Sequence, residues 1–223
     1  LFDFSTVSDP LVLDMAASPG GNTTHIGSLI KDKGLIIAND FGVDRLTALR
    51  LVLQNWGLVS AAVTRFPGEK FGRWYPETFD VVLLDAPCSM QSLRSTDSHP
   101  MRPISSREQS SLSRRQFKML ESALSAVKVG GQIVYSTCTL APEEDEMVLH
   151  ALLDAYAMSV RVELSQKFHE NPAPALASYK DLNFHPQIHN AMRLWPHIFG
   201  TSGFFAARLV KTAPIIMDFE ESP

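Results

Sequence analysis

The chain has 223 residues, of which 45% are hydrophobic and 20% charged, and its formal net charge is −4. This composition suits one globular domain with a core, and it excludes collagen-like, low-complexity and disordered chains. No apolar run approaches the roughly 18 residues that a membrane-spanning helix needs, so we expect no membrane partner. The first residues lack the basic segment of a secretory signal, and the two cysteines make no disulfide framework, so we expect an intracellular, cytoplasmic protein.

Short apolar runs alternate with longer amphipathic stretches through most of the chain. The apolar runs predict seven strands, over residues 11–16, 35–39, 61–63, 79–84, 132–135, 160–164 and 203–210. The amphipathic stretches predict helices over residues 22–31, 43–56 and 109–127. A further helix is predicted from Pro142 to about Tyr156, because a proline followed by four acidic residues is typical of a helix N-terminus.

Continuous apolar strands that alternate with helices predict a parallel sheet that is covered on both faces. We therefore predict an α/β fold, a doubly wound, mostly parallel sheet of seven strands. Residues 169–188 are rich in Pro, Asn and Ala, and they predict a long irregular insertion, either a functional loop or a surface excursion. In such a sheet ligands bind beyond the carboxyl ends of the strands, so we searched the segments that follow them.

A glycine-containing loop follows the first predicted strand and runs from Asp14 to Gly21. Glycines there let a ligand approach the backbone and the first N–H groups of the next helix. Asp40 follows the second strand, 20 residues past Gly20, and a carboxylate at this spacing can accept both ribose hydroxyls of a nucleoside cofactor. The loop lacks the G-x-G-x-x-G pattern, which favours S-adenosylmethionine over a dinucleotide. The alternatives are a plain turn and a helix cap.

The two cysteines each follow a central strand, on the same rim as the glycine loop. Asp85-Ala-Pro-Cys88-Ser follows the fourth strand, and Ser136-Thr-Cys138-Thr follows the fifth. The alternative is that each cysteine is a small buried apolar residue, but such residues are more natural within the strands themselves. Two thiols without a C-x-x-C pattern or a nearby His pair do not make a zinc site, so we expect no metal.

These motifs resemble those of the RNA cytosine-5 methyltransferases, the NOL/NSUN/Sun group. The Pro-Cys and Thr-Cys segments are similar to its two signature motifs, residues 12–21 to its cofactor loop, and residues 203–211 to its closing strand. Phe71-Gly and residues 76–80 are most similar to the bacterial RsmF-like rRNA branch. The resemblance implies a Rossmann-like class I methyltransferase fold, S-adenosyl-L-methionine as cofactor, and RNA as partner, rRNA favoured with tRNA as the alternative.

The resemblance also implies roles for three residues. Cys138 attacks C6 of a cytosine as a thiolate, which makes C5 nucleophilic enough to take the methyl group. Asp85 hydrogen-bonds N3 and stabilises the charge that develops there. Cys88 is needed to release the covalent adduct. DNA cytosine-5 methyltransferases attack with their Pro-Cys residue instead, but the Thr-Cys residue present here takes that role. The base must leave its stack to admit the thiol.

The cofactor site implied by the resemblance lies mostly in the first loop. The residues expected there are Asp14, Ala17, Ser18, Pro19, Gly20, Gly21, Asn22, Asp40, Arg45 and Asp85. The catalytic domain is expected to span residues 1–212, with a C-terminal tail at 213–223. The chain does not begin with Met, so we expect a piece of a longer protein from which the RNA-binding domains of the family are missing.

Three positions depart from the family's pattern. Asn22 stands where the family usually has Lys, Pro67 where it commonly has Asp, and Met90 where it usually has Gly. They motivate a second hypothesis, a non-catalytic RNA-binding or ribosome-assembly factor of the same fold. A third, a small-molecule methyltransferase, would not need two cysteines on the rim. The basic stretch from Arg94 to Lys118 is expected either to be a solvated face or to meet RNA phosphates.

Overall fold

A computed structural model describes residues 1–92, 103–165 and 170–216 of the chain. Its strands are β1 (Leu11–Asp14), β2 (Leu35–Asn39), β3 (Ala61–Thr64), β4 (Phe79–Asp85), β5 (Val127–Thr137), β6 (Val160–Glu163), β7 (Ser178–Tyr179), β8 (Leu182–Asn183), β9 (Met192–Leu194) and β10 (Phe204–Lys211). Its helices are α1 (Gly21–Ile30), α2 (Val43–Asn55), α3 (Phe71–Trp74), α4 (Ser106–Ala126), α5 (Glu146–Ala155) and α6 (Pro196–Phe199). Two 3₁₀ turns, η1 (Gly68–Lys70) and η2 (Pro186–Asn190), complete the elements.

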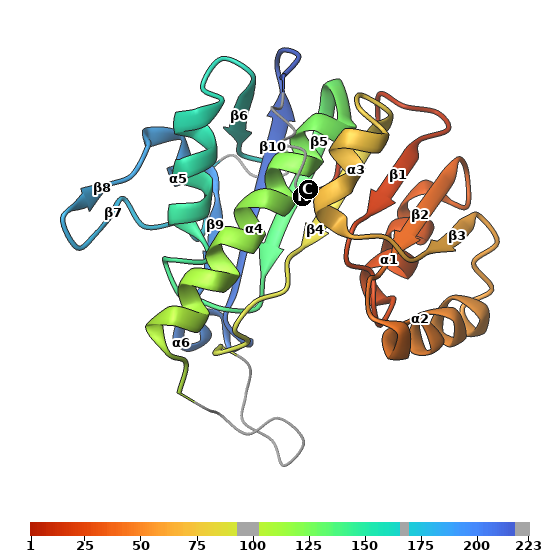
Figure 1. Ribbon diagram of the computed structural model, residues 1–223, viewed down its shortest axis with the longest axis horizontal. Coiled ribbons are helices and arrows are strands. Elements are labelled where there is room, and N and C mark those ends of the chain that lie inside the picture. The colour runs from red at the N-terminus through yellow and green to blue at the C-terminus, as the bar shows by residue number, and fades with distance from the viewer. Residues whose placement is uncertain (93–102, 166–169, 217–223) are drawn as a thin grey trace, which may run out of the picture.

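The main sheet has the strand order β3-β2-β1-β4-β5-β10-β6 (Figure 1). The strands from β3 to β5 pair in parallel, and β10 runs antiparallel to both β5 and β6. The predicted doubly wound, mostly parallel sheet is therefore confirmed, and all seven predicted strands are present. The short β9, which pairs with the start of β10, adds an eighth strand that the sequence reading did not include.

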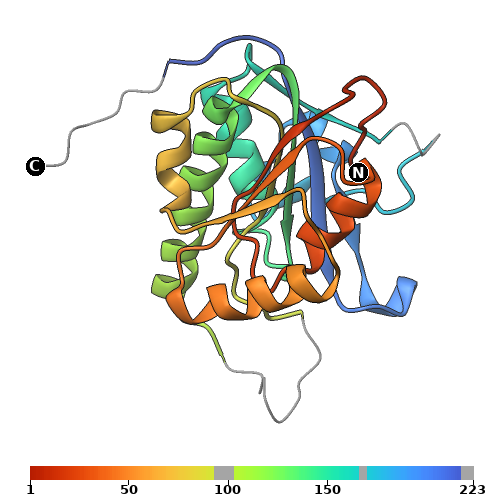
Figure 2. The same ribbon diagram turned by 90° about the vertical axis from the view of Figure 1, so that its right-hand side faces the viewer.

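Helices cover both faces of the sheet, as Figure 2 shows. Helices α1 and α2 lie on one face, where Val12, Ile36 and Val81 pack against Ile26 of α1. Helices α3, α4 and α5 lie on the other face, over the larger apolar core. Burial of both faces explains why the central strands are continuous apolar runs without alternation. Because β1, β2, β4 and β5 run parallel, their carboxyl ends share one rim of the sheet.

The start of the helix predicted at Pro142 is wrong. Residues 142–145 form turns, and α5 begins at Glu146. Three of the four acidic residues after Pro142 are buried. Of these, Glu146 and Asp145 lie with Arg193 of β9, which donates to Glu146 Oε1 at 2.8 Å and to Asp145 Oδ2 at 3.3 Å. Buried carboxylates need such a partner, and nothing near Pro142 in the sequence indicates an arginine about fifty residues away.

Other boundaries differ by a few residues. Helix α4 starts at Ser106, because the Ser105 hydroxyl accepts the Glu108 backbone N–H and caps the helix. Strand β1 ends at Asp14, two residues earlier than predicted. The insertion predicted over 169–188 is described from residue 170, and it is less irregular than expected, since it contains the β7–β8 hairpin and η2 and buries Phe184 and Ile188 in the core. Residue 169 and residues 94–102 of the basic stretch lie outside the described residues.

Candidate active site

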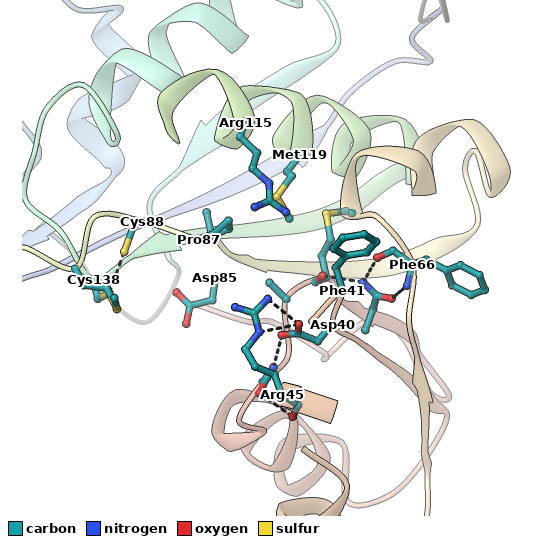
Figure 3. Close-up of a pocket in the computed structure, with 17 residues that line it drawn as sticks. Asp40, Phe41, Arg45, Phe66, Asp85, Pro87, Cys88, Arg115, Met119 and Cys138 are labelled. Atoms are coloured by element: carbon teal, nitrogen blue, oxygen red, sulfur yellow. Dashed lines mark hydrogen bonds and ion pairs between the residues drawn. The ribbon is translucent and has the colours of Figure 1, made fainter. Parts of the chain in front are cut away.

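Residues at the ends of β1, β2, β4 and β5 line a cavity of about 270 Å³ at this rim. Figure 3 shows Asp85 between two groups of side chains, the cysteine pair on one side and Asp40 with Arg45 on the other. The register of the sheet explains the grouping, because Asp14 pairs with Leu83 of β4 and Asp85 pairs with Ser136 of β5. Strands that are far apart in the sequence thus end next to one another at the same rim of the sheet.

The two cysteines face each other across the end of β4 and β5. The Sγ atoms of Cys88 and Cys138 are 2.9 Å apart, both thiols are free, and both side chains are partly exposed to the cavity. The hydrogen bond between the two thiols lowers the pKa of Cys138, while the same bond, together with burial, raises the pKa of Cys88. The pair can therefore hold one negative charge, on Cys138, at a pH where an isolated thiol keeps its proton.

Asp85 is held by neutral donors on both carboxylate oxygens. Ser136 Oγ donates to Oδ1 at 2.8 Å, and Asn22 Nδ2 donates to Oδ2 at 2.9 Å. Burial raises the pKa of Asp85, and these two hydrogen bonds oppose that rise without cancelling it. A partly buried carboxyl fixed in this way can keep its proton to higher pH than an exposed one and can share it with an acceptor in the cavity.

Asp40, at the end of β2, is oriented by four contacts. Its Oδ1 accepts from Arg45 Nη2 and from the Gly42 backbone N–H, each at 2.8 Å, and from Arg45 Nε at 3.0 Å. Its Oδ2 accepts the Ser18 backbone N–H at 3.3 Å. Because three of the four contacts fall on Oδ1, Oδ2 keeps acceptor capacity toward the cavity.

Asp14 lies beneath the rim and is fully buried. Thr23 Oγ1 donates to its Oδ2 at 2.6 Å, while its Oδ1 has no hydrogen-bond partner in the part of the chain that the structure describes. Burial raises the pKa of Asp14 to about 7, against the lowering effect of the Thr23 hydrogen bond. The loop that follows turns at Gly20, whose φ of +115° is a backbone conformation that favours glycine.

Comparisons with known proteins give the family. The model of the family described as 16S rRNA methyltransferase RsmB/F matches residues 4–210. The chain belongs to this family. Ribosomal RNA small subunit methyltransferase F of Aeromonas hydrophila is 38% identical over 207 residues, which cover 92% of the chain and 41% of that protein. The chain thus spans about two fifths of the length of this curated relative.

Solved structures agree with this membership in the RsmB/F family. The crystal structure of NSun6 from Pyrococcus horikoshii with SFG has a TM-score of 0.77 and 29% identity, and the match covers 92% of this chain and 49% of that one. A methyltransferase homolog protein from Pyrococcus horikoshii has a TM-score of 0.77 and 34% identity, with coverage of 91% and 62%. The resemblance read from the Pro-Cys and Thr-Cys motifs is confirmed.

The site predicted for this RsmB/F-family chain divides into two groups. Six of its residues line the cavity: Ser18, Asp40, Arg45, Asp85, Cys88 and Cys138. The others stand around it without lining it: Asp14, Ala17, Pro19, Gly20, Gly21 and Asn22. Asn22 nevertheless reaches the site through its hydrogen bond to Asp85. Of the other two departures from the family's pattern, Met90 lines the cavity, while Pro67 lies between the lining residues Phe66 and Gly68.

Several residues that line this cavity were not predicted from the sequence. Phe41 and Phe66 stand beside Asp40, and Met119 and Arg115 reach the cavity from α4 (Figure 3). Arg115 belongs to the basic stretch assigned to a solvated face or to RNA, and it forms an ion pair with Glu69 at 2.9 Å. Phe41 directly follows Asp40, so the prediction of Asp40 as a site residue could have included it. Phe66 comes two residues after β3 and next to Pro67, a position already singled out from the family's pattern, so the sequence did indicate this loop. Met119 carried no signal, because only the fold brings it to the cavity.

Among the described residues, no group of three or more His, Cys, Asp or Glu side chains could hold a metal ion. No helix in the described part of the chain combines the length and apolar character that crossing a membrane requires.

Proposed function

We propose that this chain transfers a methyl group from S-adenosylmethionine to C5 of a cytosine in RNA, ribosomal RNA in particular. The transfer proceeds through a covalent bond between Cys138 Sγ and C6 of the base, and Cys88 assists its release. One observation carries the proposal: two free thiols lie 2.9 Å apart on a rim that also holds a partly buried carboxyl, and the pKa of Cys138 is lowered. Family membership supports the same reaction class.

The residues of the cavity fit S-adenosylmethionine. Asp40 Oδ2 has acceptor capacity for ribose hydroxyls, and the aromatic rings of Phe41 and Phe66 offer flat apolar surface beside it for a purine. The cavity continues from there to Asp85 and the cysteines, where the reacting end would lie. When bound, the cofactor supplies the methyl group from its sulfonium. NSun6 from Pyrococcus horikoshii, a relative by structure, was crystallised with SFG.

The chain's own residues supply the activation. The Cys138 thiolate gives an electron pair to C6 of the cytosine, and the C5–C6 π electrons shift toward C4 and N3. Asp85, whose pKa is raised by burial, can donate its proton or a hydrogen bond to N3, which stabilises the charge and leaves C5 nucleophilic. Asn22 and Ser136 keep this carboxyl in one orientation while it serves N3.

Release reverses the addition after C5 has been methylated. The C5 proton passes to a solvent base, its bonding pair restores the C5–C6 double bond, and the C6–S bond breaks with its pair returning to Cys138 Sγ. A proton that N3 has taken from Asp85 returns to that carboxylate once C5 carries the methyl group. The Cys88 thiol, 2.9 Å from that sulfur, can then donate a hydrogen bond to the departing thiolate. Loss of Cys88 should therefore slow release more than attack.

The test uses the chain with S-adenosylmethionine labelled in the methyl group and a 16S rRNA transcript, with tRNA in parallel. We expect label in 5-methylcytosine with wild type, none with Cys138→Ala, and a covalent protein–RNA band on a denaturing gel with Cys88→Ala. Preferential labelling of tRNA would identify tRNA, and not ribosomal RNA, as the substrate. Cofactor and RNA binding without any methyl transfer would favour the non-catalytic factor, and unchanged turnover in Cys138→Ala would refute the mechanism.

A further inference from the structure

The loop that carries Cys88 is fastened to the protein by two buried polar side chains, Glu144 and Gln116. Both are fully buried. Glu144 Oε2 accepts the backbone N–H of Ser89 at 2.9 Å and Gln116 Nε2 at 3.0 Å, and Gln116 Nε2 also donates to the Pro87 carbonyl oxygen at 3.0 Å. Since Pro87 and Ser89 flank Cys88, the backbone is held on both sides of that thiol.

Glu144 is also tied to the loop that carries Cys138. It follows Cys138 by six residues, and its backbone carbonyl accepts the hydroxyl of the buried Tyr135 at 2.5 Å. A second link joins the two loops directly, because Ser89 Oγ donates to Thr139 Oγ1 at 3.0 Å. The glutamate therefore belongs to the loop that carries Cys138, is anchored to β5 through Tyr135, and holds the Cys88 loop through Ser89.

This arrangement is not the one that stability alone favours. Glu144 Oε1 and Gln116 Oε1 are buried without a hydrogen-bond partner in the residues that the structure describes. A buried carboxylate with an unsatisfied oxygen costs free energy, and apolar side chains of similar volume often replace such groups at no loss of stability. Unsatisfied buried groups call for an explanation, and a role in placing the neighbouring thiol is one.

We propose that Glu144, with Gln116, is a positioning residue that holds Cys88 at hydrogen-bonding distance from Cys138. It acts through Cys88 and does not itself touch the substrate. The role of Glu144 in catalysis rests on the function proposed above, because the spacing of the thiols matters for release of the RNA adduct. The spacing itself is a property of the folded chain and can be measured without RNA.

The first measurement is the rate at which the two thiols close to a disulfide under limiting diamide. Each thiol loses a proton, the pair gives two electrons to the diazene, which becomes the hydrazine, and one S–S bond forms; mass spectrometry counts the thiols left. We expect Glu144→Ala and Gln116→Met to slow closure by about tenfold or more, because the loop is freed. Glu144→Gln keeps one acceptor for the Ser89 N–H, so we expect it to stay within about threefold of wild type.

Two control variants separate positioning from general damage. Glu143→Gln changes the adjacent carboxylate, whose side chain binds Gln109, Tyr179 and Lys180 and not Ser89, so we expect wild-type closure. Ile26→Val loosens the core on the opposite face of the sheet. Equal slowing in Ile26→Val and Glu144→Ala at equal loss of stability, or unchanged closure in Glu144→Ala and Gln116→Met, would overturn the proposal. Gln116→Met serves if Glu144→Ala does not fold.

The second measurement follows the RNA adduct. With a 16S rRNA transcript, we expect Glu144→Ala to accumulate the covalent band as Cys88→Ala does, and the double variant to accumulate no more than Cys88→Ala alone, because both changes act on one step. An additive increase in the double variant would show that Glu144 acts elsewhere. If Cys88→Ala yields no adduct while Glu144→Ala still slows closure, the proposed function fails and the positioning role stands.

Discussion

Asp14 makes the stability of this fold depend on pH, and Asp14→Asn removes that dependence. The pKa of Asp14 is raised from 3.8 to about 7, first by burial and then by the charges of Asp85 and Asp40, against the hydrogen bond from Thr23. The folded state therefore keeps this proton to higher pH than the unfolded chain does. The contribution of Asp14 to stability is full below about pH 4 and is lost as the pH rises to about 7.

The size of the effect follows from the shift. At about 1.4 kcal/mol per pKa unit, a rise from 3.8 to about 7 corresponds to about 4 kcal/mol. Asparagine keeps an acceptor for Thr23 Oγ1 and cannot ionise, but its amide leaves a buried donor unpaired at a cost of about 1–3 kcal/mol. Asp14→Asn should be the less stable protein at pH 4 and the more stable one at pH 8.

Urea unfolding of both proteins between pH 4 and pH 8.5 tests this. The difference in unfolding free energy should move by about 4 kcal/mol in favour of Asp14→Asn across that range. Asp44→Asn, at an exposed carboxylate in the first turn of α2, is the matched control and should leave the difference flat. A difference for Asp14→Asn that stays constant to within about 1 kcal/mol would refute the argument that burial keeps Asp14 protonated.

Three further changes have expected outcomes. Arg193→Leu leaves Asp145 and Glu146 buried without their cation and should lower the unfolding free energy by about 3–5 kcal/mol in urea titration, and a loss below about 1 kcal/mol would contradict the ion-pair reading. Gly20→Ala should cost about 1–3 kcal/mol, because φ is +115° and a Cβ would meet Leu49 and Val52 at 3.1 Å; thermal unfolding should show Gly21→Ala, which meets nothing within 4 Å, to be tolerated. Asn22→Lys places a cation at Asp85 and should lower the pKa of that carboxyl. The Asp85-dependent limb of the pH–rate profile for methyl transfer should then move to lower pH. An unmoved limb would count against Asp85 as the group that binds N3.

The fold class could be predicted from the sequence because the central strands are buried on both faces. Continuous apolar runs such as 79–84 leave no choice but a covered parallel sheet, and the rim of that sheet then follows. The motif residues Asp85, Cys88 and Cys138 could be named for the same reason. Asp85 is the last residue of β4, Cys88 comes three residues later, and Cys138 directly follows β5, so local order in the sequence already placed them on one rim.

The remainder of the site depends on partners that are distant in the sequence. The acidic run after Pro142 is suited to a helix start by local rules, yet Arg193 and Gln116 draw its carboxylates inward. Met119 lines the cavity only because α4 packs there. Local pattern predicts where a strand or helix lies, but it does not report which distant side chain satisfies a buried charge.

The position of β10 has a consequence for the order in which the chain can fold during synthesis. Among the residues that the structure describes, β6 pairs in the main sheet with β10 alone, and β5 is flanked by β4 and β10. Until residues 204–211 leave the ribosome, β6 therefore has no neighbour in that sheet, and the edge of β5 next to Cys138 stays open. The parallel half of the sheet, from β3 to β5, can form early on the nascent chain. Thr137 gains its neighbour Phe205 only after residues 204–211 have emerged. Completion of the wall beside Cys138 is thus coupled to emergence of the strand encoded farthest downstream in the sheet.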